Sequence, residues 1–410
     1  MGQPVCRPFP YSRLYIISER MDFEMRVLIV DDNAMNVMVV REMLKRAGYA
    51  KISEAYSAKE MFEILQSQED ERTGIRMKID LILLDIMMPA MDGIEACRLL
   101  QADSRYRDIP IIIVTAIGDS HKLAEAMDAG ASDFVTKPIN KIELLARIRT
   151  ALRLKRELDW HKERDKRLEE ELNLARHVQD GVLPDEVCEP GIRIRASFRA
   201  SEKLAGDLYA WHRIGRRRWA LAVIDAMGHG ISSSLVSMFV ASMLKEAMPG
   251  LWTPERAFRE MNRRLSGIQP EQELIRYYCT GIYAMIDLEQ GKLEYANAGH
   301  PPGLLFAGEQ RTPERLETTN APLGMFDVLD VKSRSMKIGP GDRLCLYTDG
   351  VLNLFEDEGD NPVERLSEYL HQARRDPMMM ERLIERMPSD DRSDDRCLVS
   401  VEIGMGEMAH

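Results

Sequence analysis

The 410-residue sequence lacks the features of a secreted, membrane-spanning or disulfide-stabilised protein. Its six cysteines are far apart, with no C-x-x-C pair and no histidine at zinc-ligand spacing, which is typical of reduced thiols in a cytosolic protein. No apolar run approaches the roughly 20 residues that cross a bilayer, and residues 1–24 lack the apolar stretch of a secretion signal. We therefore expect a cytoplasmic protein in which residues 1–24 are a disordered extension or precede a later start at Met21 or Met25.

The sequence also has no excess of positive charge. It contains 56 Lys and Arg against 67 Asp and Glu, so the formal net charge is -11, with both signs interspersed. Binding to nucleic acid requires a basic patch, so nucleic acid is not expected as a main partner, and an acidic chain fits divalent metal better. With 45% hydrophobic and 30% charged residues, the chain should be globular and form two or three domains.

Residues 25–150 alternate short apolar strands with amphipathic helical stretches. The strands include RVLIV, LILLD, PIIIVTA and FVTKP, and the stretches between them include GIEACRLLQ and HKLAEAMDAG. Continuous apolar strands separated by helices indicate a parallel sheet that is covered on both faces. This segment is therefore predicted to be a doubly wound α/β domain.

Residues 151–183 predict one long helix between two domains. Neither Pro nor Gly interrupts it before its last three residues, and a three-four spacing of seam positions runs from Ala151 to Val182. His161 and Asp165 lie on this seam and weaken a coiled coil. Two interpretations stay open, a solvated linker helix and a parallel dimer or signalling helix.

Residues 184–404 are dominated by strands such as IRIRASF, RWALAVID, YYCTGIYAMID, RLCLYTD and CLVSVEI. Helical blocks lie at ISSSLVSMFVASMLKEAM and TPERAFREMNRRLSG, and a third is expected around residues 362–387. Many antiparallel-looking strands with grouped helices predict an α+β layered domain, followed by a short tail at residues 405–410.

Five polar side chains follow or end the strands of the first domain. Asp31 and Asp32 follow the first strand, Asp85 ends the third, Thr115 ends the fourth and Lys137 ends the fifth. Since the carboxyl ends of parallel strands line one crevice, these side chains should converge. Three carboxylates repel one another unless a hard cation such as Mg²⁺ lies among them, and the hydroxyl and the amine could hold phosphoryl oxygens. If these residues had no function, five suitable polar side chains would have to stand at matching strand ends by chance.

The motifs VLIVDDN, LLDIMMPAMDG, VTA and DFVTKP resemble the receiver domain of two-component response regulators, over the whole segment and in the same order. The resemblance implies that Asp85 accepts a phosphoryl group from a sensor histidine kinase. It also implies that Mg²⁺ is bound by Asp31, Asp32, Asp85 and the backbone carbonyl of Met87.

The same resemblance assigns the switch residues. It implies that Thr115 and Lys137 contact the phosphoryl group, that Phe134 is the switch aromatic, and that the Lys137–Pro138 bond is cis. Phosphorylation would add about two negative charges beside Thr115, which a two-state loop could convert into a changed surface.

The last domain contains no G-x-S-x-G, no Cys-His couple at recognisable spacing and no P-loop. Its informative residues are acids at or beside apolar strands: Asp207 in AGDLYA, Asp225 in VIDAMGHG, Asp349 in LYTDGV, and Asp394 or its neighbour in SDDRSDDRCLV. Four anchored carboxylates without a nucleophile indicate a hydrolase that uses two metal ions.

The motifs AGDLY, DAMGHGISSSL, YYCTGIYAMID, YANAGHPPGLL, APLGM, YTDGV and DDRCLV resemble, in order, metal-dependent protein phosphatases of type 2C fold in the sporulation-stage-II-E and RsbU class. The resemblance covers residues 184–403. It implies a β-sandwich flanked by helices, two Mn²⁺ or Mg²⁺ ions, and hydrolysis of phosphoserine or phosphothreonine. The preceding ELNLARHVQDGVLP is similar to the regulatory, often dimerising helix of that class, so a homodimer through the linker helix is expected. The usual substrate in such proteins is a STAS-type anti-sigma-factor antagonist.

The resemblance assigns a role to each acid. It implies that Asp225 bridges the two metals, that the carbonyl of Ala226 adds a ligand, and that Asp349 and Asp394 complete the second metal's shell. Asp207 would act on metal-bound water or bind metal directly. A bridging hydroxide would attack phosphorus in line, without a covalent enzyme intermediate.

Residues around these acids are expected to support the site. Asp395 is predicted to be a supporting carboxylate, and the first copy of the doubled SDDR repeat to be solvated loop charge. Gly228 and His229 form part of a tight turn beside Asp225. For His229 and His300 a general-acid role is the alternative to a locally hydrogen-bonded imidazole, and we favour the second interpretation.

Four positions depart from the pattern of this phosphatase class. The class usually has Gly at Ala205, an acid near Ala210, Glu at Asn353 and Thr at Cys397. None of these departures removes a predicted metal ligand. They leave open the alternative of a weakly catalytic adaptor that binds a partner in a receiver-dependent way.

Overall fold

The computed structural model describes residues 25–67, 78–116, 120–269, 276–358, 361–372, 374, 376, 378–386 and 394–404. The chain forms two compact units, Met1–Arg167 and Leu168–His410, and each is described by itself. The predicted extension, the predicted tail and the first SDDR copy lie outside the described residues. Among the described residues, no helix combines the length and the apolar character that a bilayer span requires.

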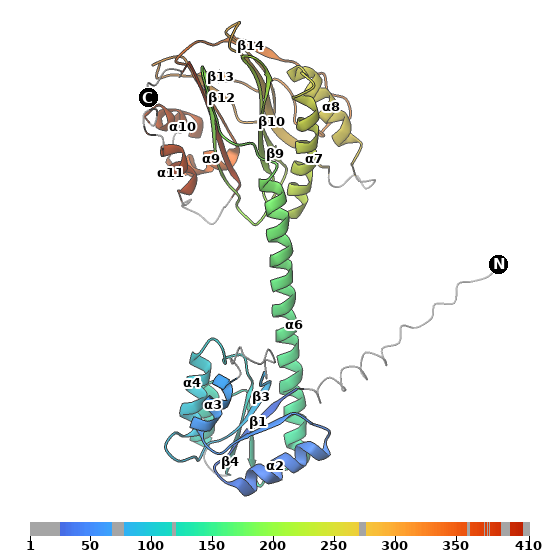
Figure 1. Cartoon of the computed structure of the whole chain (residues 1–410), viewed down its shortest axis with the longest axis vertical. Coiled ribbons are helices and arrows are strands. Elements are labelled where there is room, and N and C mark those ends of the chain that lie inside the picture. The colour runs from blue at the N-terminus through green and yellow to red at the C-terminus, as the bar shows by residue number, and fades with distance from the viewer. Residues whose placement is uncertain are drawn as a thin grey trace, which may run out of the picture. The chain divides into compact units, whose positions relative to one another are not determined.

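The first unit contains a five-stranded parallel sheet with strand order β2-β1-β3-β4-β5 (Figure 1). Its two central strands β1 and β3 are buried along their whole length, as expected for strands covered on both faces. This order is the flavodoxin-like doubly wound arrangement, so the predicted fold class is confirmed. The strands are β1 Val27–Val30, β2 Ile52–Ala55, β3 Leu81–Asp85, β4 Ile111–Ala116 and β5 Asp133–Lys137.

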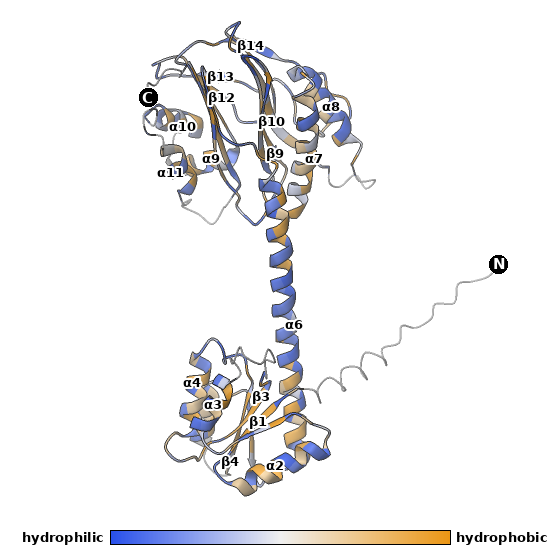
Figure 2. Ribbon diagram, in the orientation of Figure 1, coloured by the Kyte–Doolittle hydropathy of each residue, from blue (hydrophilic) through white to orange (hydrophobic). Residues whose placement is uncertain are grey.

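Helices cover both faces of this sheet because successive strand residues point to opposite sides. Leu28 and Val30 pack in one core with residues of α3, α4 and α5, whereas Val27 and Ile29 pack in the other with residues of α2 and α6. The strands form the apolar interior in Figure 2. The helices are α2 Ala34–Arg46, α3 Ala58–Ser67, α4 Gly93–Ala102, α5 Ser120–Asp128 and α6 Lys141–Asp180.

Helix α6 is one continuous helix of 40 residues. The predicted linker helix therefore does not begin at residue 151, because no Gly or Pro separates it from the last helix of the first unit, which starts at Lys141. The middle of α6 is hydrophilic (Figure 2). Three leucines of the predicted seam remain about half exposed: Leu154 at 54%, Leu158 at 52% and Leu168 at 47%.

The second unit is a sandwich of two antiparallel sheets, with strand orders β14-β11-β10-β9-β8 and β13-β12-β15-β16-β7-β6. Apolar side chains of both sheets, such as Val223, Ile282, Leu344 and Val399, fill the space between them. The strands are β6 Val187–Glu189, β7 Ile192–Arg199, β8 Asp207–Gly215, β9 Arg218–Ala226, β10 Cys279–Asp287, β11 Lys292–Ala298, β12 Gly303–Phe306, β13 Glu314–Leu316, β14 Arg334–Lys337, β15 Arg343–Tyr347 and β16 Arg396–Ile403.

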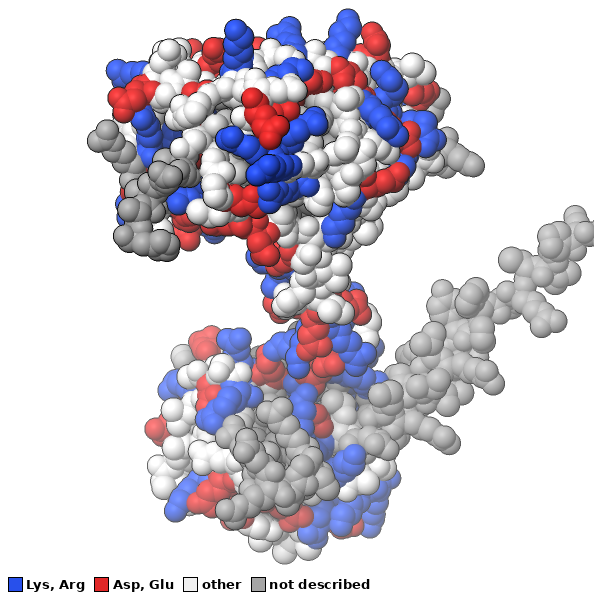
Figure 3. All heavy atoms as spheres, turned by 45° about the horizontal axis from the view of Figure 1, so that its top comes forward, with Lys and Arg blue, Asp and Glu red and all other residues white. Residues whose placement is uncertain are grey.

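Helices flank the sandwich on both outer faces, which confirms the predicted layered α+β class. Helices α7 (Ile231–Ala247) and α8 (Pro254–Ser266) pack on the sheet that contains β9. The other sheet is covered by α9 (Asp349–Leu352), the 3₁₀ helix η1 (Asn353–Glu358), α10 (Pro362–Gln372) and α11 (Met379–Glu385). The block predicted around residues 362–387 is thus two helices. On the visible faces in Figure 3 both signs of charge are interspersed, as the composition predicts.

We expect Gly93→Ala to destabilise the first unit by about 1–3 kcal/mol. Gly93 opens α4 directly against the end of β3, and an added Cβ would lie 2.1 Å from the carbonyl oxygen of Asp85, where only a backbone shift gives relief. The measurement is the first unit's thermal transition, followed by calorimetry of the full chain. Gly339→Ala is the matched control, because no atom lies within 4 Å of its added Cβ. Equal stability of the two variants would contradict the prediction.

Candidate functional sites at the ends of the strands

The first unit brings three acids and one lysine together at the carboxyl edge of its sheet. The carboxylate oxygens of Asp31, Asp32 and Asp85 lie within 4.8 Å of one another. Asp31 and Asp85 are buried, whereas Asp32 is exposed. The Lys137 Nζ atom donates to Asp31 Oδ2 at 2.9 Å and to Asp85 Oδ1 at 2.6 Å. The predicted convergence of these four side chains is therefore present in the structure.

The charges in this crevice are compatible with a bound cation. Burial raises the pKa of Asp85, Lys137 opposes that shift, and the charges of Asp31 and Asp32 add to it. Burial lowers the pKa of Lys137, but its hydrogen bonds to the two buried acids outweigh this, so the net shift is upward. One ammonium faces three carboxylates, and oxygen donors of this kind fit Mg²⁺. Met87, whose carbonyl was predicted as a further ligand, lies in the loop after β3 with an exposed side chain.

Residues that were not singled out from the sequence orient Asp31. The Asn36 amide donates to both carboxylate oxygens at 3.0 Å, and the backbone N–H of Asn33 donates to Oδ1 at 2.9 Å. Asn33 also caps α2, where its side chain accepts from the N–H of Met35. The sequence signal that could have found these two residues is their spacing, because an Asn stands two and five positions after Asp31.

The predicted switch residues lie on the neighbouring strands β4 and β5. Thr115 is half-buried, and its Oγ1 donates to the carbonyl of Ala116 at 3.3 Å. The Arg147 guanidinium lies 5.2 Å from the ring centroid of Phe134. The Lys137–Pro138 bond is cis, as predicted.

The second unit places its acids at the ends of strands from both sheets. Asp207 begins β8 and lies opposite Asp225 in the register of β8 and β9. Asp349 begins α9 directly after β15, and Asp394 precedes β16. A Cβ on Gly350 would lie 3.2 Å from the Cβ of Asp394, so α9 approaches this segment closely.

The charges of these acids act on one another. Burial raises the pKa of Asp207 well above its usual value, and the charge of Asp225 adds to this. Burial raises the pKa of Asp225 to about 8, with contributions from Asp349 and Asp394. Asp349 is exposed as a residue, yet partial desolvation of its carboxyl and the charge of Asp394 raise its pKa. Within the described residues none of the four forms an ion pair with Lys or Arg, so the donor set fits divalent cations.

Asp395 acts as a hydrogen-bond acceptor for the loop that precedes Asp207. It is buried and accepts from the N–H of Ser201 at 2.7 Å, from the hydroxyl of Ser201 at 2.9 Å and from the N–H of Gly206 at 2.6 Å. These contacts fit the supporting role predicted for Asp395, and metal binding by Asp394 stays a prediction.

Sequence reasoning missed Thr348, which orients Asp207. The Thr348 hydroxyl is fully buried, donates to Asp207 Oδ2 at 2.7 Å and accepts from the N–H of Cys397 at 3.0 Å. The only available signal was a hydroxyl residue directly before Asp349. Cys397, where Thr was expected, is also fully buried.

The two histidines differ in exposure. His229 is exposed, its Nδ1 lies 2.7 Å from Glu202 Oε1, and the flanking Gly228 and Gly230 both have φ of 81°. His300 is buried, its Nδ1 lies 2.8 Å from the Thr280 hydroxyl, and burial lowers its pKa to about 3. A neutral imidazole cannot donate a proton as a general acid near pH 7, so the geometry favours the structural interpretation of His300.

The C-terminal turn of α6 is attached to the residue that leads into Asp207. The buried Gln179 amide donates to the carbonyl of Ala205 at 2.7 Å, and its oxygen accepts from the N–H of Ala205 at 3.0 Å. On the same helix Glu169 pairs with Lys203 at 3.0 Å. Ala205 is one of the departures from the phosphatase pattern, and the Gln179 side chain binds both the N–H and the carbonyl of its backbone. The other departures lie on β8 (Ala210) and at the start of η1 (Asn353).

Both units are similar to known protein families. Residues 27–149 match the family model of the response regulator receiver domain, and residues 215–404 match that of stage II sporulation protein E (SpoIIE). Phosphoserine phosphatase RsbP of Bacillus subtilis (strain 168) is 32% identical over 57% of this chain and 58% of RsbP. Response regulator PleD of Caulobacter vibrioides (strain NA1000 / CB15N) is 36% identical over 34% of this chain and 29% of PleD. The chain thus covers less than two thirds of either relative.

Solved structures include a similar domain. The SiaA-PP2C domain of Pseudomonas aeruginosa covers 58% of this chain and 98% of its own, with 17% identity and a TM-score of 0.49.

We expect the metal-free second unit to lose stability as pH rises. The raised pKa of Asp225, about 8, means that the folded state binds more protons than the unfolded state, in which an Asp has a pKa near 3.8. The free energy of unfolding therefore falls between about pH 4 and pH 8, by up to a few kcal/mol. Mn²⁺ should raise the melting temperature, and more so at pH 8 than at pH 6. Calorimetry of the full chain with chelator or Mn²⁺ measures both effects.

Asp225→Asn provides the matched control for this prediction. Removing one charge should stabilise the metal-free unit at pH 8 and reduce the gain from Mn²⁺. A melting temperature that rises with pH in the metal-free wild type would contradict the mutual repulsion of the four acids.

Proposed function

We propose that this chain, a response regulator receiver domain joined to a phosphatase domain of the SpoIIE family, hydrolyses phosphoserine or phosphothreonine on a partner protein under control of receiver phosphorylation. The cluster of Asp207, Asp225, Asp349 and Asp394 carries the proposal, because the pKa values of the first three are raised, Asp394 adds its charge to Asp225 and Asp349, and none of the four has an ion-pair partner among the described residues. Acids held close together in this way need cations. The similarity to a phosphoserine phosphatase supports the substrate class.

The chain's own residues hold and orient this centre. Asp225, Asp349 and Asp394, with the carbonyl of Ala226, would bind two Mn²⁺ or Mg²⁺ ions, and Asp207 would bind metal or a water. When bound, the ions activate water and neutralise charge on the phosphoryl oxygens. Thr348 fixes one carboxylate oxygen of Asp207, so that acid needs no reorganisation when the phosphoryl group arrives.

The receiver would take its phosphoryl group from a sensor histidine kinase. Asp85 would accept it, Asp31 and Asp32 would help to hold the Mg²⁺ that compensates the added charge, and Lys137 could move its hydrogen bond from the Asp85 carboxylate to a phosphoryl oxygen. Thr115 on the neighbouring strand would bind a second phosphoryl oxygen.

Helix α6 would carry the signal between the two domains. It starts in the core of the receiver and ends at Gln179, whose amide holds the backbone of Ala205 two residues before Asp207. The exposed seam that contains Leu154, Leu158 and Leu168 would pair with a second copy to form a homodimer. A STAS-type anti-sigma-factor antagonist in the cytoplasm is the proposed substrate protein, on the resemblance to the RsbU class.

We expect metal-dependent hydrolysis of p-nitrophenyl phosphate that Asp225→Asn reduces at least a hundredfold, because a ligand shared by two cations is lost. Turnover with Mn²⁺, Mg²⁺ and chelator measures it. Asp330→Asn, at an exposed loop position of the same domain, is the control and should be unchanged. A wild type that binds metal but shows no turnover would contradict the enzyme and favour the adaptor.

We expect beryllofluoride on the receiver to change the phosphatase rate in the wild type and not in Asp85→Asn. Gln179→Leu should still bind beryllofluoride but lose most of the change in rate, because it leaves both polar groups of the Ala205 backbone without the amide that holds them. Glu171→Leu, exposed on the same helix, is the matched control. If beryllofluoride changed the phosphatase rate of Gln179→Leu as much as that of the wild type, signal transfer through the contact between Gln179 and Ala205 would be ruled out.

A further inference from the structure

A short loop of the phosphatase domain exposes large apolar side chains. We call residues 324–328 the Phe326 loop. Phe326 is 52% exposed and Val328 is 88% exposed. Two such side chains within three residues form a local apolar surface, and surfaces of this kind mark contact sites for other molecules more often than isolated apolar residues do.

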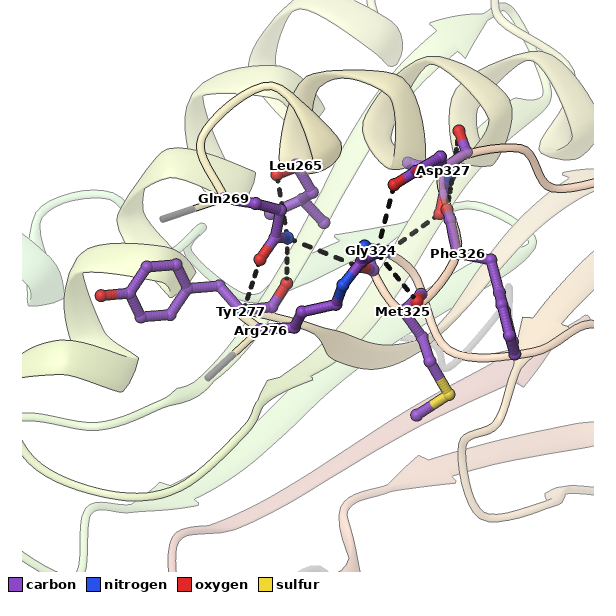
Figure 4. Close-up of polar contacts among 9 residues, drawn as sticks. Leu265, Gln269, Arg276, Tyr277, Gly324, Met325, Phe326 and Asp327 are labelled. Atoms are coloured by element: carbon purple, nitrogen blue, oxygen red, sulfur yellow. Dashed lines mark hydrogen bonds and ion pairs between the residues drawn. The ribbon is translucent and has the colours of Figure 1, made fainter. Parts of the chain in front are cut away.

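Hydrogen bonds from neighbouring segments hold the backbone of the Phe326 loop (Figure 4). The Asn262 amide, which is buried, donates to the carbonyl of Phe326 at 2.9 Å and accepts from the N–H of Gly324 at 2.8 Å. The Gln269 amide donates to the carbonyl of Tyr277 at 2.8 Å and accepts from its N–H at 2.9 Å. A loop whose backbone is bound in this way loses little conformational entropy when a partner contacts it.

The close packing of Gly324 adds to this rigidity. Gly324 has a φ of 86°, and a Cβ there would lie 2.6 Å from the carbonyl oxygen of Tyr277. Arg276 donates to Asp327 at 3.1 Å and to the carbonyl of Met325 at 3.3 Å, so the charge of Asp327 is paired. The exposed surface of the loop therefore combines the apolar side chains of Phe326 and Val328 with one paired charge, that of Asp327.

Backbone pairing places the Phe326 loop beside the metal cluster. Cys279 lies opposite Ala226 in the register of β9 and β10, and it exchanges two hydrogen bonds of 2.9 Å with Leu323 on its other side. The N–H of Met227 donates to the carbonyl of Tyr278 at 3.0 Å. Since neighbouring strands lie about 4.8 Å apart, Leu323 lies two strand spacings, or about 10 Å, from the backbone of Ala226, and Phe326 follows three residues later.

We propose that the Phe326 loop binds an apolar side chain of the phosphorylated protein substrate, between about three and six residues from the phosphorylated residue. An extended segment advances about 3.3 Å per residue, so three residues span the distance of about 10 Å to Leu323, and up to three more reach Phe326. The metal cluster recognises phosphate, which every phosphoprotein carries, so discrimination among substrates has to come from the surface around it. The inference rests on the proposed phosphatase function.

Two phosphoserine peptides test the proposal. One carries leucine three and six residues before and after the phosphoserine, and the other carries serine at all four positions. We expect the wild type to have a KM about tenfold lower for the leucine peptide, because burying one such side chain contributes about 1.5 kcal/mol or more. In the double variant Phe326→Ser, Val328→Ser this preference should fall below twofold, with turnover of p-nitrophenyl phosphate unchanged.

Controls separate the possible failures. Met378→Ser removes a side chain of equal exposure, 54%, beside the opposite sheet, and should keep the preference. A wild type that hydrolyses p-nitrophenyl phosphate without preferring leucine overturns the docking surface but not the phosphatase. No turnover of any substrate overturns the proposed function itself. If the double variant instead changes the molar mass in light scattering and keeps the preference, the loop is a contact between copies and the proposal is wrong.

Discussion

Mutual repulsion among carboxylates at strand ends is the constraint on which both units depend. In the crevice of the first unit Lys137 already compensates part of the charge of Asp31 and Asp85, so under the proposed function one divalent cation would suffice there and an incoming phosphoryl group would compete for the lysine. In the acid cluster of the second unit no such ammonium is present among the described residues, and the pKa of Asp225 rises to about 8. The proposed reversible modification in one unit and the proposed metal binding in the other therefore start from different charge balances.

Holding such acids in place requires neutral donors around them, and these donors come from distant parts of the chain. Asn36 orients Asp31, and Thr348 orients Asp207 across 141 positions of sequence. Asp395 holds the backbone before Asp207 and so acts through another residue. Sequence reasoning can find the acids because each lies at or beside the end of an apolar strand. It cannot find the donors, since a single Asn or Thr carries no pattern and its partner is fixed only by tertiary structure.

The same distinction explains what else was predictable. Apolar strand runs and their order predicted both fold classes, because burial on two faces or on one leaves a period in the sequence. The start of α6 was missed because nothing in the sequence interrupts the helix near residue 150. Gln179 was counted as a seam position, whereas its amide contacts Ala205. A three-four spacing shows that residues share a helix face, but it does not show which surface that face meets.

Strand β9 lies between β8 and β10, and we assign different roles to these two neighbours: control to β8 and substrate recognition to β10. On one side β8 begins with Asp207, and the backbone just before it is held by α6, so a small shift of that helix would move an acid of the cluster without touching the others. On the other side β10 connects the cluster to the rigid Phe326 loop. The segment that controls the rate and the segment that recognises the substrate would then lie on opposite sides of β9, the strand that carries Asp225. A change in the receiver could alter turnover while the substrate surface keeps its shape, because the two routes share only the central strand.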